Sequence, residues 1–451
     1  MHAAISRSSL RAGTSTDTDR QAPVADLCSA SVAADVIIEE VERVSGGYYP
    51  PAAAYAQDPR RLPAAVRLGI YADLLYRDDG AAVSTDNAFV LFIAALAERV
   101  DELVVFGRLD PRPASAPYGL PQHVRFVALP HYARVTDVAP MLRGLRETAR
   151  AFARAIEPLE LIWIFGPHPI ALELVRVAHA RHVPVVLGIR QDFPAYIVRR
   201  LPSRGWFWAV PAAHLLERTF RLLARRLPTV VVGEDLAFRY RRGNLHVTGI
   251  SLVRREAVAG TADALGKDWS GELRLLSVGR LDAEKSPLLL PEILASLRRN
   301  GAWRLRIAGE GPLAAAVTAR AQALGVGDAL ELRGYVPYGE DLWELYRSSH
   351  AFLHVSKTEG LPQVLFEAQA AGLPIVATDV GGVAAALGYG ACGLLVPPGD
   401  PTAAAEACER LRRDRELRVR LIRDGLELAR RETLESQLDR LVPFLESQRR
   451  R

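Results

Sequence analysis

The chain has 451 residues, of which 49% are hydrophobic, 24% charged and 7% aromatic, a composition typical of folded globular proteins. This length exceeds one ordinary hydrophobic core, so we expect two domains and exclude a chain that is disordered throughout. The formal net charge of +5 permits attraction to phosphates, nucleic acid or an anionic membrane surface without selecting one of them.

The cysteines Cys28, Cys392 and Cys408 are odd in number and far apart, which favours neither a disulfide framework nor a cysteine-rich metal site. No apolar run reaches the length of a membrane span, and no signal-type apolar core lies near the first arginines. We therefore expect a cytoplasmic protein.

Residues 1–64 are predicted to be a partly disordered tail. The first half is rich in Ala, Ser, Thr and Asp and has neither helical nor strand periodicity, which is typical of disorder. Apolar residues spaced along 34–45 would line one face of a short helix before a cluster of Gly and Pro. We assign this tail no function.

An N-terminal Rossmann-like domain is predicted over residues 65–255, because short apolar runs alternate there with longer amphipathic ones. We expect strands at 66–75, 102–106, 124–129, 159–165, 183–189 and 229–232, and helices at 84–99, 137–157, 169–181 and 211–226. Such alternation predicts an α/β domain with a parallel, doubly wound sheet.

A second domain of the same kind is predicted over 272–430, after a linker at 256–271. We expect strands at 273–278, 303–308, 329–332, 351–355, 374–378 and 393–396, with helices at 288–299, 313–324, 340–348, 362–371 and 401–430. Two Rossmann-like domains in tandem would leave a cleft between them. A last helix within 431–451 would pack back on the N-terminal domain.

Two cations and a glycine follow the first predicted strand of the second domain, in the segment SVGRLDAEKSP at 277–287. Gly279 permits close approach, Arg280 can form forked hydrogen bonds to phosphate oxygens, and Lys285 can act as a mobile point charge. A solvated loop with chance cations is the alternative. The position at the end of a strand favours a diphosphate site, since ligands bind there in open parallel sheets.

The segment from Ser356 to Gly382 joins a strand end, a helix start and two glutamates. Pro362 suits the first helical position, and the free N–H groups of a helix start favour anions. Glu359 would lie before this helix and Glu367 within it, where carboxylates can accept hydrogen bonds from vicinal sugar hydroxyls. The alternative is that Glu359 only complements the helix dipole and Glu367 faces solvent.

Residues 270–400 resemble the donor domain of retaining GT-B glycosyltransferases of family 4, also called glycosyl transferases group 1. The segments GRLDAEKS, IAGEGPL, EGLPQVLFEAQAAGLPIVATDVGG and GLLVPPGDP carry the resemblance, and their combination is specific. The N-terminal domain resembles this family only loosely. The resemblance implies a UDP- or GDP-sugar donor and a glycan, lipid-linked or small-molecule acceptor, and it implies no partnership with nucleic acid.

The resemblance also implies roles for individual residues. Arg280 and Lys285 would contact the donor diphosphate, Glu359 would lie by the transferred sugar, and Glu367 would hold the ribose. Backbone amides of Gly360, Leu361 and Pro362 would approach the sugar and phosphate.

Reaction in this group is metal-independent, so the resemblance implies neither a metal nor a further cofactor. The one Asp-x-Asp sequence, Asp17 to Asp19, lies in the predicted tail and is dismissed as a metal site.

On the acceptor side the sequence offers a histidine and a polar loop. His168 follows the fourth predicted strand, where the resemblance implies a histidine near the transferred sugar, although a structural role is the alternative. Arg190, Gln191 and Asp192 end the next strand and would contact acceptor or sugar. Gly80 would supply the one glycine of a loop that carries two in the family.

A second departure from the family pattern follows Gly381 and Gly382, where Val383-Ala-Ala385 replaces the usual sequence with Pro-Glu. The main hypothesis is a retaining hexosyltransferase. The departures keep open a non-catalytic GT-B-like module that binds a nucleotide sugar or a partner, and an epimerase on the same two-domain plan is a third hypothesis.

The segment 201–226 combines an aromatic cluster, Trp206-Phe-Trp208, with an arginine-rich amphipathic helix. One interpretation is a helix that rests on the cytoplasmic face of an anionic membrane, which would suit a lipid-linked acceptor. The alternative is a partly buried helix that lines the acceptor side.

Overall fold

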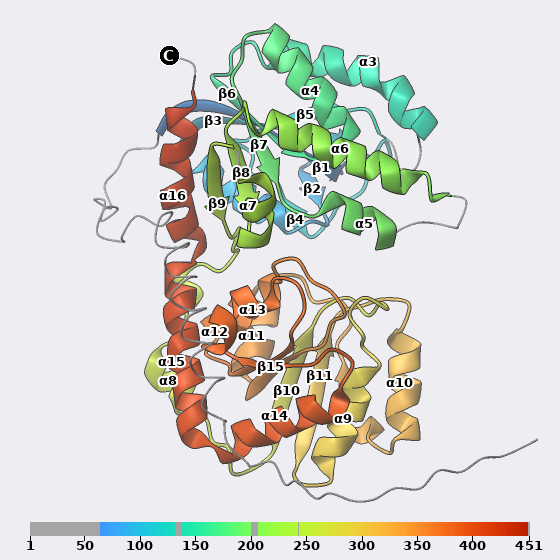
Figure 1. Cartoon of the computed structure of the whole chain (residues 1–451), viewed down its shortest axis with the longest axis vertical. Helices are drawn as coiled ribbons and strands as arrows, with labels where there is room; N and C mark the ends of the chain where they lie inside the picture. Colours follow the sequence, from blue (N-terminus) through green and yellow to red (C-terminus); the bar gives the residue numbers. More distant parts are fainter. Residues whose placement is uncertain (1–63, 132–137, 200–205, 242, 450–451) are drawn as a thin grey trace, which may run out of the picture. The chain divides into compact units, whose positions relative to one another are not determined.

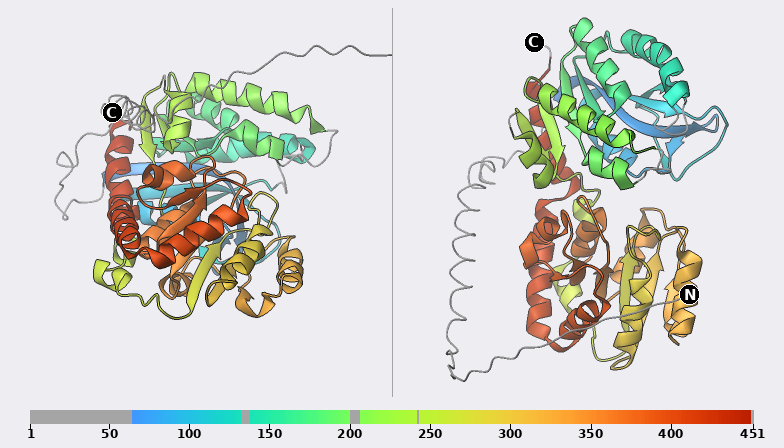
Figure 2. Two further views of the ribbon diagram at one scale, coloured as in Figure 1. Left: turned by 60° about the horizontal axis from the view of Figure 1, so that its bottom comes forward. Right: turned by 45° about the vertical axis from the view of Figure 1, so that its right-hand side comes forward.

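The computed structural model describes residues 64–131, 138–199, 206–241 and 243–449 (Figure 1). The helix predicted at 34–45 and the Asp17 to Asp19 sequence lie outside these residues. The described residues form two α/β sheets with their helices, and each sheet is treated by itself below (Figure 2).

The first sheet has nine strands, and its parallel part follows the order β5-β3-β1-β6-β7-β8-β9. These strands are β1 (Ala64–Asp78), β3 (Val100–Leu109), β5 (Arg125–Leu129), β6 (Leu161–Gly166), β7 (Val185–Ile189), β8 (Thr229–Val232) and β9 (Leu245–Thr248). Their helices are α2 (Phe89–Ala97), α3 (Val138–Ala155), α4 (Pro169–Ala180), α5 (Phe193–Arg199), α6 (Ala209–Leu223) and α7 (Glu234–Tyr240). Strand β9 and helices α5 and α7 were not predicted from the sequence, because they have only four to seven residues each.

Strand β6 shows why both faces of this sheet are covered. Its side chains point alternately to opposite faces, as in any strand, and nearly all of them are apolar. Trp163 and Phe165 lie in one hydrophobic core, together with α2, whereas Ile162 and Ile164 lie in the other, together with α3 and α4. A strand that is apolar on both faces requires a helix layer on each side.

The prediction of a helix at 84–99 is wrong at its start, because the second strand of a β-hairpin occupies the first of these residues. Strand β1 continues to Asp78 and pairs antiparallel with β2 (Val83–Thr85), which in turn pairs with β4 (Tyr118–Gly119). Asp79 Oδ1 accepts hydrogen bonds from the N–H groups of Ala81 and Ala82, an arrangement that stabilises a turn. Gly80 lies in this turn with φ of +87°, a conformation that glycine adopts readily.

The second sheet has six strands in the order β12-β11-β10-β13-β14-β15, and all neighbouring pairs are parallel. They are β10 (Leu273–Val278), β11 (Trp303–Ala308), β12 (Leu330–Leu332), β13 (Ala351–His354), β14 (Ile375–Thr378) and β15 (Leu394–Val396). The accompanying helices are α9 (Leu289–Arg298), α10 (Ala314–Ala323), α11 (Glu340–Arg347), α12 (Gln363–Ala370), α13 (Val383–Ala386), α14 (Pro401–Arg413) and α15 (Arg415–Arg431). Each strand lies where the sequence predicted one.

The order of this sheet defines where a ligand would bind. The chain runs outward from β10 to β11 and β12 on one side, and then returns to β13 on the other side of β10. The loops that leave β10 and β13 at their carboxyl ends therefore diverge, which makes this pair the topological switch point of the sheet.

The segment 256–271 is more ordered than a plain linker. It contains helix α8 (Thr261–Leu265), and Ala264 of that helix packs against Ile422 and Leu426 of α15.

The last helix, α16 (Leu434–Ser447), packs on the first sheet. Leu434, Leu438, Leu441 and Leu445 share the hydrophobic core that contains β1 and α2. Gln437 adds a polar contact, because its Oε1 accepts a 2.7 Å hydrogen bond from the backbone N–H of Ser251.

Candidate functional site

Glu359 is the centre of a buried polar cluster at the carboxyl end of β13. Its Oε1 accepts a 2.5 Å hydrogen bond from Lys285 Nζ and a 2.6 Å hydrogen bond from Ser356 Oγ. His354 Nε2 lies 2.9 Å from the same oxygen. Among the described residues none hydrogen-bonds the second oxygen, Oε2. The switch point thus brings together two residues that the sequence assigned to one site, Lys285 and Glu359.

The charge of Glu359 is strongly stabilised. Burial by itself would raise the pKa of this carboxyl, but the hydrogen bond with His354 and the positive charge of Lys285 outweigh it and hold the pKa at about 2. Glu359 therefore stays ionised at neutral pH and can only accept hydrogen bonds.

The loop after β10 is held by an aspartate that the sequence analysis did not single out. Asp282 Oδ1 accepts hydrogen bonds from the backbone N–H groups of Glu284, at 3.1 Å, and Lys285, at 3.2 Å. The N–H of Lys357 donates to the carbonyl of Glu284, which ties this loop to the loop after β13. These contacts fix the backbone from which Lys285 reaches Glu359.

Arg280, by contrast, is exposed. Its guanidinium pairs with Asp282 at 2.9 Å and with Glu284 at 3.1 Å, and 54% of its side chain is accessible to solvent. Exposed pairs of this kind are weak, so the guanidinium can exchange them for another anion at little cost.

Glycines in two further loops support these segments from the side. A Cβ on Gly309 would lie 1.9 Å from the carbonyl oxygen of Gly279, and one on Gly381 would lie 2.0 Å from that of Glu359. A Cβ on Gly382 would lie 2.2 Å from the carbonyl oxygen of Gly360. No side chain fits at such distances, so these glycines let neighbouring backbones pack under Gly279 and Glu359. In the sequence they indicated only tight turns.

Helix α12 starts one residue later than predicted, at Gln363. Pro362 is the residue before the helix, with φ of −75° and ψ of 114°, so it is extended and does not occupy the first helical position. The physical reason is that Pro fits either place, since its fixed φ suits both helix and extended chain. Gly360 is exposed and Leu361 half-buried, so backbone of this segment is accessible ahead of the helix.

Glu367 lies within α12 and is almost fully buried, with 5% of its surface exposed. Its Oε2 accepts a 2.7 Å hydrogen bond from the hydroxyl of Tyr346. Burial raises the pKa of Glu367 to about 7, and the hydrogen bond from Tyr346 opposes this rise only in part. The alternative of a solvent-facing Glu367 is therefore wrong.

His168 precedes α4 and belongs to a second buried cluster, in the first sheet. Its Nδ1 accepts a 3.3 Å hydrogen bond from the N–H of Ile170 and lies 3.4 Å from the Tyr71 hydroxyl, while its Nε2 lies 3.4 Å from Asp73 Oδ2. Asp73 in turn accepts a 2.8 Å hydrogen bond from Arg108 Nε. Burial lowers the pKa of His168, and the negative charge of Asp73 opposes this.

The sequence analysis missed Tyr71, Asp73 and Arg108. Asp73 offered a signal, because it is an acid among the apolar residues of the predicted strand.

The polar loop after β7 contributes three different environments. The guanidinium of Arg190 lies over the rings of Phe89, at 4.5 Å, and Phe165, at 4.8 Å, and burial lowers its pKa to about 10. Asp192 accepts a hydrogen bond from the N–H of Ala195 and pairs with Arg239. Gln191 is exposed. Arg190 and Asp192 thus have structural partners of their own.

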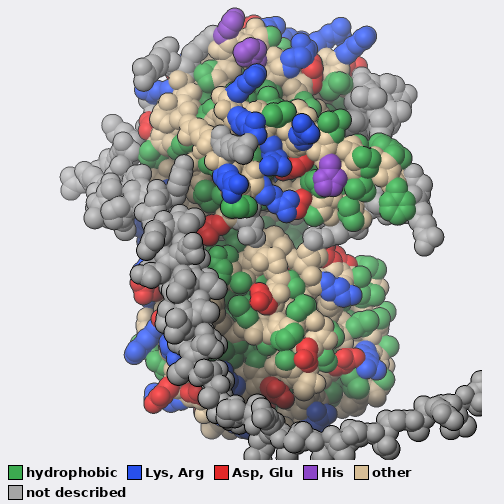
Figure 3. Space-filling view, viewed as in Figure 1, with side chains coloured by type: hydrophobic (Ala, Val, Ile, Leu, Met, Phe, Trp, Pro, Cys, Tyr) green, Lys and Arg blue, Asp and Glu red, His purple; other side chains and the backbone are tan. Residues whose placement is uncertain are grey.

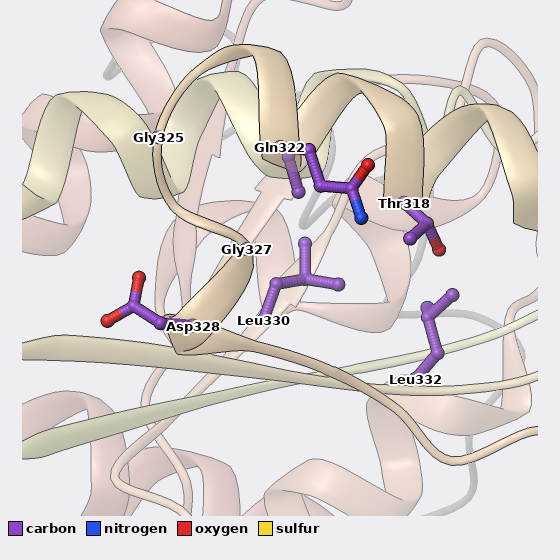
Figure 4. A pocket seen from close by; sticks show the side chains of 8 residues that line it. Thr318, Gln322, Gly325, Gly327, Asp328, Leu330 and Leu332 are labelled. Carbon is purple, nitrogen blue, oxygen red and sulfur yellow. The ribbon is translucent and has the colours of Figure 1, made fainter.

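A pocket elsewhere in the second sheet contains none of the predicted site residues. It follows the groove between α10 and the edge strand β12, where Thr318, Gln322, Asp328 and Leu332 contribute side chains (Figure 4). Within the described ranges there is no cluster of three or more His, Cys, Asp or Glu that could hold a metal ion. Helices long and apolar enough to cross a membrane are likewise absent from those ranges.

Comparison with known proteins identifies the second domain. Residues 267–427 match the family described as Glycosyl transferases group 1. The match covers less than half of the chain. The resemblance inferred from GRLDAEKS and the segment around Glu359 is thereby confirmed.

Curated relatives cover parts of the chain. A D-inositol 3-phosphate glycosyltransferase of Corynebacterium efficiens is 35% identical over 213 residues, which are 46% of this chain and 47% of the relative. A GDP-mannose-dependent alpha-mannosyltransferase of Mycobacterium tuberculosis is 28% identical over 267 residues, which are 58% of this chain and 64% of the relative. The chain thus spans less than two thirds of either relative.

Solved structures establish the fold beyond this domain. A sucrose-phosphate synthase from Thermosynechococcus elongatus is similar over 85% of this chain and 98% of its own length, with a TM-score of 0.63 and 18% identity. Anabaena Alr3699/HepE, solved in complex with UDP, is similar over 84% of this chain and 100% of its own, with a TM-score of 0.62 and 14% identity. The fold is GT-B, which confirms the predicted fold class.

Proposed function

We propose that the chain is a retaining glycosyltransferase that moves a sugar from a UDP- or GDP-linked donor to an acceptor. The observation that carries this proposal is the arrangement at the switch point of the second sheet. There Lys285 pairs with the ionised Glu359 ahead of α12, and the exposed Arg280 lies in the same loop as Lys285. The relatives and neighbours support it, since one is named for GDP-mannose and another was solved with UDP.

Arg280 and Lys285 are assigned to the donor diphosphate. Negative charge grows on this leaving group in the transition state, and fixed cations at that place lower the barrier. A diphosphate would compete with Asp282 and Glu284 for Arg280, which is exposed and weakly paired. We assign charge neutralisation to these two side chains and to the backbone N–H groups of Gly360 and Leu361, and the proposal calls for no metal ion.

Glu359 is assigned to the transferred sugar. Two donors, Lys285 and Ser356, hold its Oε1, and His354 Nε2 lies 2.9 Å from it, while its Oε2 can accept a hydrogen bond from a sugar hydroxyl. Because its pKa of about 2 keeps it ionised, it can stabilise the positive charge that develops at the anomeric carbon.

The reaction step follows from these assignments. The bond between the anomeric carbon and the diphosphate oxygen breaks, and the acceptor oxygen forms the new bond on the same face. The departing phosphate oxygen takes the acceptor proton, so no side-chain base is required and the anomeric configuration is retained.

Glu367 is assigned to the ribose and His168 to the acceptor side. With a pKa of about 7, Glu367 is available in both protonation states near neutrality, so it can accept from or donate to a ribose hydroxyl. For His168, a sugar hydroxyl would have to compete with the contacts to Tyr71, Ile170 and Asp73. Arg190, Gln191, Asp192 and Gly80 remain proposed acceptor-side residues.

Two measurements test the proposal in sequence. A thermal-shift series with UDP, GDP and other nucleoside diphosphates should raise the unfolding temperature for one base, since a ligand bound only by the folded state stabilises it. Transfer from the matching nucleotide sugar across an acceptor panel, with the anomeric configuration read by NMR, then tests catalysis. Saturable binding without transfer or hydrolysis would instead favour a non-catalytic nucleotide-sugar module, and isomerised donor without acceptor would favour an epimerase.

A further inference from the structure

An apolar stripe runs along the exposed side of helix α6. Trp208, Leu215 and Leu222 recur at intervals of seven residues, close to two helical turns, so they lie in line on one face. Their exposed fractions are 55%, 66% and 49%, which are high for large apolar side chains. Phe207, at 63%, extends the exposed apolar surface at the amino-terminal end of the helix.

Arginines flank this stripe, and no acid accompanies them on the exposed side. Arg218, Arg221 and Arg225 are all exposed and lie beside the two leucines. The single acidic residue between positions 206 and 226 is Glu217, which points to the interior and is only 6% exposed. Apart from His214, the large exposed side chains of α6 are therefore apolar or positively charged. We call this exposed side the α6 face, and it consists of Phe207, Trp208, Leu215, Arg218, Arg221, Leu222 and Arg225.

Helix α6 is attached to the first domain by the residues on its buried side, and not by the apolar stripe. Ala213, Glu217 and Phe220 are the buried residues of the helix, and Phe220 belongs to the core that covers one side of the first sheet. The helix is already anchored by these residues, so the apolar stripe does not contribute to the core. Figure 3 shows many basic side chains over the first domain, with acidic and histidine side chains among them; all of these basic side chains are arginines, since the three lysines lie in the second domain.

We propose that the α6 face rests on an anionic lipid bilayer. An amphipathic helix with arginines beside aromatic and leucine side chains fits the boundary between headgroups and acyl chains, where the apolar groups enter and the cations meet anionic headgroups. The stripe from Trp208 to Leu222 is about 21 Å long at 1.5 Å per residue, so the helix would lie flat in the interface. Phosphate-rich polymers would satisfy the arginines but give no place to three large apolar side chains.

The α7 helix offers a neighbouring group of the same kind. Phe238 is 68% exposed, and the guanidinium of Arg241 lies 4.4 Å from the centre of its ring. Helix α6, strand β8 and helix α7 follow one another along the chain, so Phe238 and Arg241 lie close to α6 in the sequence.

Vesicle sedimentation with the full chain tests this proposal. We expect the protein to sediment with vesicles of phosphatidylcholine mixed with phosphatidylglycerol and to stay in solution with pure phosphatidylcholine. Added salt should weaken the binding, because it screens the arginines. Substituting Arg218→Ala and Arg221→Ala together should weaken binding roughly tenfold or more. Substituting Leu215→Ser and Leu222→Ser should have an effect of similar size, roughly tenfold or more.

A matched control uses two arginines on another helix. Arg420 and Arg423 are exposed on α15 with the same spacing of three, so the variant Arg420→Ala/Arg423→Ala should bind like the unchanged protein. Unfolding temperatures of all variants are measured first, so that a loss of fold is recognised. No sedimentation of the unchanged chain, equal binding to neutral vesicles, or full binding by the leucine variant would each overturn the proposal. None of these readouts involves a nucleotide sugar, so they are independent of the proposed transfer reaction.

Discussion

Replacing Lys285 with Met is expected to lower the free energy of unfolding at pH 7 by about 1 to 3 kcal/mol. The side chain of Glu359 is only 8% exposed, so removing a partner leaves a buried carboxylate with fewer contacts. The pKa of Glu359 is about 2 against an ordinary value of 4.5, and this difference corresponds to about 3 kcal/mol at 1.36 kcal/mol per unit. His354 and Ser356 remain in the variant, so about 3 kcal/mol is an upper bound.

The effect should depend on pH in a defined direction. Because the folded pKa of Glu359 lies below that of the unfolded chain, its contribution is present above pH 4.5 and is lost as the pH falls toward 2. In the Lys285→Met variant the pKa is less depressed, so less stability remains to be lost on acidification. The stabilities of the two proteins should therefore converge below pH 4.5.

Urea unfolding from pH 7 down to pH 2.5 measures both statements. Arg280→Ala is the matched control, because Arg280 is a neighbouring cation that is exposed, and its removal should change stability by less than about 0.5 kcal/mol. Both variants should lose the thermal shift with a nucleoside diphosphate. A destabilisation by Lys285→Met that is the same at pH 7 and pH 2.5, or that is absent, would refute the reasoning about Glu359.

Three further predictions concern other buried groups. The pKa of Glu367 is about 7, above its value of 4.5 in the unfolded chain, so the charged form that appears as the pH rises destabilises the fold. Replacing Glu367 with Gln should therefore raise the free energy of unfolding by about 1 to 3 kcal/mol at pH 8 and by little at pH 4, as measured by urea titration. Equal effects at the two pH values would contradict this. Gly381→Ala should cost about 2 kcal/mol or more in thermal unfolding, because its Cβ would lie 2.0 Å from the carbonyl oxygen of Glu359; an unchanged midpoint would count against the packing described. Asp73→Asn should lower the pKa of His168 further, because Asp73 supplies the charge that opposes burial. Histidine NMR against pH measures it, and a rise would disprove the assignment.

The second sheet could be predicted from the sequence almost completely. Its strands are buried on both faces, so each reads as a short apolar run between amphipathic helices. Glu359 and Lys285 could be assigned to one site because both follow strand ends, and parallel strands present their carboxyl ends at one edge. Only the structure shows that the two side chains pair with each other and that His354 lies beside the same oxygen of Glu359. His354 stands in an apolar strand only five residues before Glu359, and that position was its one signal.

The first sheet was harder because several of its features depend on pairing between distant segments. The β1–β2 hairpin depends on antiparallel pairing of Arg77 with Ser84, and the helical pattern that follows concealed it. The Asp79-Gly80 pair is a turn signal that would have indicated the hairpin. Asp73 and Arg108 meet because β1 and β3 are neighbours, which no local pattern reveals. Local periodicity predicts elements, but it does not predict which side chains of different strands meet.

The two glutamates of the second domain show how the partner of a buried carboxyl group determines its pKa. Glu359 and Glu367 are both nearly excluded from solvent, so burial acts on both in the same direction and raises the pKa. What differs is the partner. Glu359 has the cation Lys285 and the ring of His354, whereas Glu367 accepts a hydrogen bond from the neutral hydroxyl of Tyr346. A charged partner outweighs burial and a neutral one does not. A buried carboxylate beside a cation is suited to stabilising positive charge, and one near its pKa at neutrality is suited to a hydroxyl that can donate or accept. If the proposed roles hold, donor affinity should therefore vary with pH near 7 through Glu367 while Glu359 stays ionised throughout that range.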